Sequence, residues 1–91
     1  MKKPITLKFY SDPGHGWLAV KISFLEKIGL HTYDFSVCSY RKGSTVYLEE
    51  DCDAVIFMKR LKESFMSDEY GIVFKNTDRR SPIRSYPSIH S

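Results

Sequence analysis

The chain has 91 residues, of which 42% are hydrophobic and 14% aromatic, and its formal net charge is +3. This length predicts one domain with a thin hydrophobic core, and the composition excludes wholesale disorder. The small net charge is no argument by itself for nucleic-acid binding, and no apolar run approaches the roughly 18 residues of a membrane-spanning helix.

The amino terminus reads Met1-Lys2-Lys3-Pro4 and leads into no long apolar stretch, so no signal peptide is recognisable. The two cysteines, Cys38 and Cys52, are therefore expected to be reduced, buried thiols rather than a disulfide. Together these features predict a cytoplasmic protein that does not associate with a membrane.

The first third of the chain predicts a strand, a turn, a strand and a short helix. Residues 5–10 alternate in polarity and are rich in β-forming residues, and residues 16–20 read as the returning strand. Between them, residues 12–14 combine Asp, Pro and Gly, which favours a tight turn with Gly in a positive-φ conformation. Apolar residues recur at helical spacing over residues 21–28, and Gly29 is a typical helix stop.

The pattern then repeats. Residues 33–40 alternate as a strand, residues 41–44 have the composition of a hairpin turn, and residues 45–48 form a second strand. A longer helix is predicted over 52–65, with Asp51 or Asp53 as its N-cap, and its buried face consists of Ala54, Phe57, Met58, Leu61 and Phe65.

A final strand is predicted over residues 71–75, which makes the element order ββαββαβ. This order favours an α+β fold, with an antiparallel sheet and both helices packed on one face. Residues 1–76 would form this domain. Residues 77–91 contain two prolines and no helical period, so we expect an irregular tail, which Ile83, Tyr86 and Ile89 would attach to the domain.

The stretch SDPGHGW, residues 11–17, allows two interpretations. Asp12 and His15 have the residue types of a general base and its orienting carboxylate. Alternatively, Asp12 serves the turn and Trp17 anchors the following strand, and the second interpretation is favoured because no nucleophile lies nearby in the sequence. His15, His31, His90, Cys38 and Cys52 show no metal-ligand spacing, and we expect neither a metal nor a cofactor.

Charged residues form two candidate interaction surfaces. The stretch LEEDCDA contains Glu49, Glu50, Asp51 and Asp53, which would cap the helix, dock onto a basic groove, or both. Tyr47 and Arg41 would lie at the rim of such an interface. The alternative is a nucleic-acid surface composed of Arg41, Lys42, Lys59, Arg60, Arg79, Arg80 and Arg84.

Three stretches, SDPGHGWLAVK, TVYLEEDCDA and DRRSPIRSY, together resemble a family of small proteins encoded by tailed phages, prophages and plasmids. The resemblance implies no catalytic residues. It implies a phage accessory protein in the host cytoplasm, of the kind that disables a host machine such as a restriction or CRISPR complex.

The sequence thus favours a non-enzymatic protein of the anti-CRISPR or anti-restriction type, which would occlude the basic groove of a host protein or ribonucleoprotein by steric and electrostatic means. Two alternatives remain open. One is direct binding of DNA or RNA through the basic residues, and the other is a small enzyme that uses Asp12 and His15, with Cys38 or Cys52.

Overall fold

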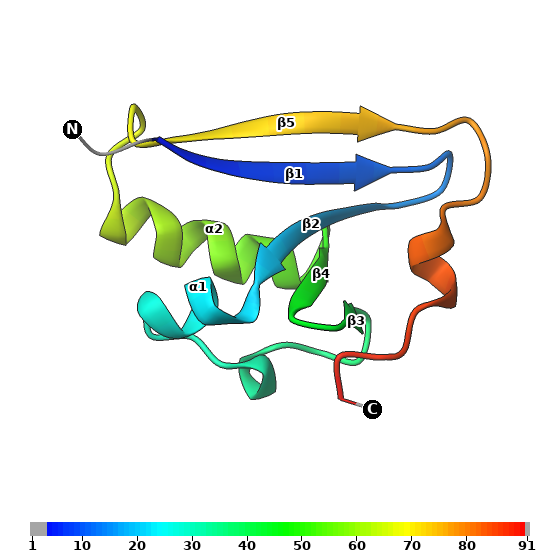
Figure 1. Ribbon diagram of the computed structural model, residues 1–91, viewed down its shortest axis with the longest axis horizontal. Helices are drawn as coiled ribbons and strands as arrows, with labels where there is room; N and C mark the ends of the chain where they lie inside the picture. Colours follow the sequence, from blue (N-terminus) through cyan, green and yellow to red (C-terminus); the bar gives the residue numbers. More distant parts are fainter. Residues whose placement is uncertain (1–3, 91) are drawn as a thin grey trace.

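The computed structural model describes residues 4–90, in which two α-helices pack on the same face of a five-stranded sheet (Figure 1). The α+β class and the predicted order of strands and helices are confirmed. We call the face that carries both helices the helix face. The elements are β1 (Ile5–Ser11), β2 (Gly16–Lys21), α1 (Ile22–Lys27), β3 (Tyr40–Lys42), β4 (Thr45–Glu49), α2 (Asp53–Ser64) and β5 (Tyr70–Asn76), with 3₁₀ turns at Thr32–Asp34 and Pro82–Ser85.

The sheet has the strand order β3-β4-β2-β1-β5. The neighbours β3–β4, β4–β2 and β2–β1 are antiparallel, but β1 and β5 are parallel over their whole length. The prediction of an antiparallel sheet is therefore wrong for this pair. The reason is that α2 carries the chain back along the sheet, so that β5 starts at the end where β1 also starts (Figure 1).

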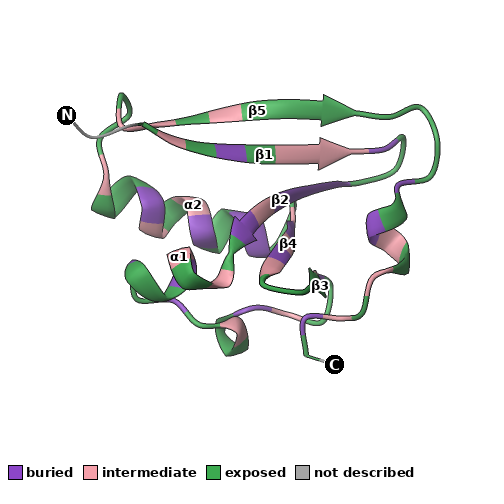
Figure 2. Ribbon diagram, viewed as in Figure 1, coloured by how far each residue is buried: buried purple, intermediate pink, exposed green. Residues whose placement is uncertain are grey.

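The core lies between the sheet and the helices. β2 and β4 each contribute two fully buried residues on the helix face, and α2 contributes Phe57 and Leu61. Each such side chain stabilises the fold by roughly 1.5–3 kcal/mol relative to an exposed position. Figure 2 shows that burial is concentrated in β2, β4 and the inner side of α2, whereas β5 is largely exposed.

The predicted strand over residues 33–40 is wrong. Residues Thr32–Asp34 form a 3₁₀ turn, the chain is irregular through Ser39, and β3 begins only at Tyr40. The cause is the carboxylate of Asp53, which accepts hydrogen bonds from the backbone N–H and the hydroxyl of Ser36. A backbone donor that is bonded to a side chain is lost to a strand ladder.

The carboxy-terminal segment packs onto the domain. Ile83 and Ile89 are buried, and Ile89 belongs to the main core cluster. The segment also covers the edge of the sheet at β3, because the Arg41 N–H donates to the Pro87 carbonyl at 2.9 Å and Tyr40 forms a bridge with Ser88. Its 3₁₀ turn is capped by Ser81, whose hydroxyl accepts from the Ile83 N–H.

We call the opposite side of the sheet the tail face, because the carboxy-terminal segment covers part of it. Trp17 is buried there and lies edge-on to Tyr40. Tyr47 lies beside Tyr86 of the segment, with ring centroids 5.2 Å apart. The sheet therefore buries side chains on both faces, which the alternation of polarity alone does not reveal.

Both cysteines are free, but they are exposed, so the prediction of buried thiols is wrong. Cys38 lies in the irregular loop before β3, and Cys52 is the N-cap residue of α2, where the following residue, Asp53, takes the inward position. In the part of the chain that the structure describes, neither helix has the length and apolarity that a membrane crossing requires.

Candidate functional site

The stretch SDPGHGW forms the connection between β1 and β2. One oxygen of Asp12, Oδ1, accepts hydrogen bonds from the backbone N–H groups of Gly14 (2.9 Å) and His15 (3.0 Å), and the Asp12 N–H donates to the His15 carbonyl at 2.9 Å. This is the turn role expected of Asp12. Gly14, however, does not adopt positive φ. A Cβ at this position would lie 2.6 Å from Nη2 of Arg84, so a larger residue here would displace the Arg84 guanidinium.

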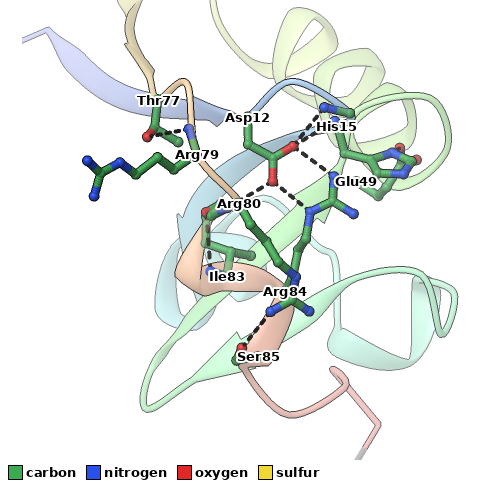
Figure 3. Close-up of polar contacts among 11 residues, drawn as sticks. Asp12, His15, Glu49, Thr77, Arg79, Arg80, Ile83, Arg84 and Ser85 are labelled. Atoms are coloured by element: carbon green, nitrogen blue, oxygen red, sulfur yellow. Dashed lines mark hydrogen bonds and ion pairs between the residues drawn. The ribbon is translucent and has the colours of Figure 1, made fainter.

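Arg84 reaches the same carboxylate from the carboxy-terminal segment (Figure 3). Its Nε donates to Oδ2 at 2.6 Å and its Nη2 donates to Oδ1 at 2.8 Å, while the Ser81 N–H donates to Oδ2 at 2.9 Å. The hydrogen bonds from Arg84 hold the pKa of Asp12 far below its ordinary value, and those from the backbone act in the same direction. The pair, which we call the Asp12–Arg84 clasp, fastens the segment to the loop.

The clasp separates Asp12 from the imidazole of His15. The Asp12 carboxylate bonds to His15 only at its backbone N–H, and the ring Nδ1 of His15 lies 3.7 Å from Oε1 of Glu49 instead. The hypothesis of a general base oriented by Asp12 is therefore wrong in its geometry. The carboxylate is saturated by donors that belong to the turn and the tail, and its side chain is only 1% exposed.

An open cleft of about 400 Å³ lies beside this loop on the tail face. It contains one imidazole, one thiol, two carboxylates, two aromatic rings and one guanidinium. No hydrogen bond joins the Cys38 thiol to the His15 imidazole. The lining residues are His15, Trp17, Cys38, Tyr40, Glu49, Asp51 and Arg84.

Glu49, Glu50 and Asp51 form what we call the acidic cluster, at the end of β4. One carboxylate oxygen from each lies within 4.8 Å of the others, and Glu50 and Asp51 are exposed. Glu49 accepts a hydrogen bond from the Asp51 N–H at 3.0 Å. Such oxygens are the ligands that Ca²⁺ or Mg²⁺ prefers, but adjacent surface carboxylates are common without an ion, so the cluster alone assigns no metal.

Asp53 does not belong to this surface, although the sequence groups it there. It is 1% exposed, and its carboxylate accepts hydrogen bonds from Ser36 and from the Ser39 hydroxyl. The same Ser39 hydroxyl accepts from the Glu49 N–H at 3.1 Å. Asp53 is thus neither a surface docking residue nor a side-chain N-cap of α2; it joins the start of α2 to the loop before β3 and to the end of β4.

The two predicted rim residues lie apart from each other. Tyr47 is half-buried on the tail face, and its burial raises the pKa of its phenol, with Tyr86 and Tyr10 adding to the shift. Arg41 is exposed on β3, where its Nε donates to the Gly43 carbonyl at 3.1 Å. Tyr47 precedes Glu49 by two residues on the same face of β4, whereas the side chain of Arg41 bonds to the hairpin turn.

The predicted basic residues come from different elements and are not all available. Arg84 is held in the clasp, and Arg60 donates to the Ile28 carbonyl at 3.0 Å and lies 3.7 Å from Glu63. The remaining exposed ones lie on the β3–β4 hairpin, on α2 and on the segment after β5: Arg41, Lys42, Lys59, Arg79 and Arg80.

Sequence reasoning missed the clasp and the bonds of Asp53. Both join residues far apart in the chain, and the only available signal was that Asp12 and Arg84 each lie within a stretch that supported the family resemblance. No family model, curated protein or solved structure matches the chain.

Proposed function

We propose that the protein is a non-enzymatic binding module that inserts the acidic cluster into a basic groove of a nucleic-acid-handling complex. The target would be a host protein or ribonucleoprotein, and the effect would be occlusion of the anti-CRISPR or anti-restriction type. The observation that carries this proposal is the crowding of the carboxylates of Glu49, Glu50 and Asp51 within 4.8 Å, with Glu50 and Asp51 exposed.

The described residues 4–90 offer the cluster little neutralising charge. Among residues 4–90, its only ion-pair contact is the one between Glu49 and His15 at 3.7 Å, and Glu50 and Asp51 have none. The crowded negative charges repel one another. A surface of positive potential relieves this repulsion, so its binding to the cluster is electrostatically favourable. A groove that accepts phosphates has that potential.

The backbone beneath the cluster is held in place before binding. The Glu49 N–H is bonded to Ser39, and the Glu50 N–H donates to the Gly16 carbonyl at 3.0 Å. Ser39 is itself bonded to the buried Asp53. A loop that is already ordered loses less conformational entropy on binding, which favours affinity.

Affinity capture from bacterial lysate tests the proposal, with the lysate treated or not treated with nuclease. A protein complex that is retained after nuclease treatment, and lost with Glu50→Lys plus Asp51→Lys, is the expected result. The matched control is Glu26→Lys, which reverses an exposed carboxylate on α1 and should leave capture unchanged.

The direct nucleic-acid alternative gives the opposite outcome. In that case nuclease removes every captured partner, free duplex binds with a steep salt dependence, and the charge reversal leaves binding intact or improves it. Either of the first two results, together with unchanged capture by the reversed variant, would refute the occlusion proposal.

A further inference from the structure

The two edge strands of the sheet, β3 and β5, differ in whether another segment covers them. The carboxy-terminal segment covers the β3 edge, whereas β5, at the other edge, has a hydrogen-bonded neighbour only on its β1 side among residues 4–90. β5 is a long edge strand, Tyr70–Asn76, with no proline and no bulge in its pairing with β1. Natural proteins usually protect such an edge, because it is a template for pairing with another strand.

The backbone groups that β5 directs outward can be identified from its ends. The Ile5 N–H donates to the Glu69 carbonyl at 2.8 Å, and the Thr77 N–H donates to the Ser11 carbonyl at 2.9 Å. Successive residues of a parallel strand turn their backbone groups alternately to the two sides. The residues that turn away from β1 are therefore Tyr70, Ile72, Phe74 and Asn76.

Apolar side chains accompany this edge. Phe74 is 66% exposed and Val73 is 41% exposed. On the helix face, Phe74 and Ile72 border a groove of about 540 Å³ between β5 and α2, where Met58 and Val55 also contribute. An exposed apolar groove beside an unpaired strand is typical of a protein interface.

We propose that two copies of the chain form a symmetric dimer by antiparallel pairing of their β5 strands about Val73. In this register Ile72 lies opposite the partner's Phe74, so residues with outward-facing backbone groups meet each other. Both residues lie on the helix face, because Leu7 and Phe9 pair with them in β1. Each Phe74 thereby comes beside the partner's Ile72 and covers its apolar groove.

Charge complementarity supports a second copy as the occupant. Asp68 and Glu69 precede β5, whereas Lys75 is its next-to-last residue and Arg79 and Arg80 outweigh Asp78 beyond its end. Antiparallel pairing brings the acidic start of one strand beside the basic end of the other, and parallel pairing would place like charges together. A twofold axis closes the assembly, so that no edge at β5 remains.

The charges that border the groove run in the direction opposite to those of β5, but they are also complementary to each other under the twofold axis. Glu50 borders it at the amino-terminal end of α2, and Lys62 borders it at the carboxy-terminal end. α2 runs in the opposite direction to β5 (Figure 1), so the twofold axis turns the Glu50 end of one groove toward the Lys62 end of the other. Glu50 thus borders this groove and also belongs to the acidic cluster.

Molar mass in solution tests the dimer. We expect twice the chain mass of 10.6 kDa at micromolar concentration, and at least a tenfold weaker dimer for Phe74→Lys, because two apolar contacts are lost and two ammonium groups enter the groove. The matched control is Val37→Lys, since Val37 is 73% exposed in the loop before β3 and should dimerise normally. A monomer at all concentrations up to about 1 mM, or a dimer unaffected by Phe74→Lys, overturns the proposal.

Exchanging the charges of Glu69 and Lys75 tests the dimer a second way, which serves if Phe74→Lys does not fold. Glu69→Lys alone and Lys75→Glu alone should each weaken the dimer, because like charges then meet across the axis. A mixture of the two variants should restore it as a heterodimer, and failure of the mixture to associate refutes antiparallel β5 pairing. Asp51→Lys, which lies outside the groove, should leave the dimer intact and so separates this inference from the proposed function.

Discussion

Arg84 donates two hydrogen bonds to the carboxylate of Asp12, at 2.6 and 2.8 Å, across 72 residues of sequence. Its guanidinium also lies over the ring of Trp17, 5.5 Å from the centroid. One side chain therefore joins the β1–β2 loop, the tail face and the carboxy-terminal segment.

We expect Asp12→Asn to lower the thermal unfolding midpoint and to release the carboxy-terminal segment. The amide keeps the shape of the side chain but loses the charge that Arg84 pairs with. Its NH₂ group also replaces a carboxylate oxygen, so the N–H groups that donated to that oxygen lose their acceptor. Hydrogen exchange at Ile83 and Ile89 measures the release. Asp78→Asn, at an exposed site, is the control, and equal exchange in both variants would show that the clasp does not hold the segment.

The clasp also predicts a pH dependence. The folded-state pKa of Asp12 is lowered, so its contribution to the free energy of unfolding is complete above the unfolded-state pKa of about 3.9. It is lost progressively as the pH falls below about 4. In denaturant unfolding, the stability difference between the wild-type protein and Asp12→Asn should be constant from pH 7 to about 5 and shrink at lower pH. A difference that grows on acidification would contradict this assignment.

We expect Gly16→Ala to destabilise the protein by about 1–3 kcal/mol, because a Cβ there would overlap Cζ of Phe9 and displace its ring. Gly71→Ala is the contrasting variant. Nothing lies within 4 Å of a Cβ at Gly71, so this change should be neutral or stabilise by about 0.5 kcal/mol. Urea denaturation of both variants measures the difference, and equal midpoints would contradict the packing at Gly16.

Asp53→Ala should cost about 3 kcal/mol, since the buried carboxylate accepts hydrogen bonds from Ser36 and Ser39 that no other group replaces. Asp51→Ala, two residues earlier and exposed, should change stability by less than about 0.5 kcal/mol. Denaturant unfolding of the two variants distinguishes a structural carboxylate from a surface one. A cost for Asp51→Ala as large as that for Asp53→Ala would reverse the assignment.

Ile89→Ala should destabilise the protein by about 2–4 kcal/mol, because Ile89 is 3% exposed and packs in the main core. The control is Ile56→Ala, at a site on α2 that is 42% exposed, where the change should be small. If Ile89→Ala unfolds at the same urea concentration as the wild-type protein, the packing of Ile89 in the core contributes nothing to stability.

Local patterns were enough for the elements whose evidence lies within a few residues. The apolar spacing of α2, the stop at Gly29 with its φ of 83° and the turn at Gly43 with its φ of 60° are all visible in the sequence, because they depend on side-chain periodicity and on the conformational freedom of glycine. The α+β class follows from the order of these elements. The acidic cluster was also identifiable, since its members are adjacent in the chain.

Only the tertiary structure decided which strands are neighbours and which charged side chains are already paired within the protein. The parallel pairing of β5 with β1, the burial of Asp53 and the capture of Arg84 by Asp12 each depend on residues that are distant in sequence and meet after folding. A polar side chain has the same local pattern whether it faces water or a buried partner, and the free energy that distinguishes the two is a property of the three-dimensional neighbourhood.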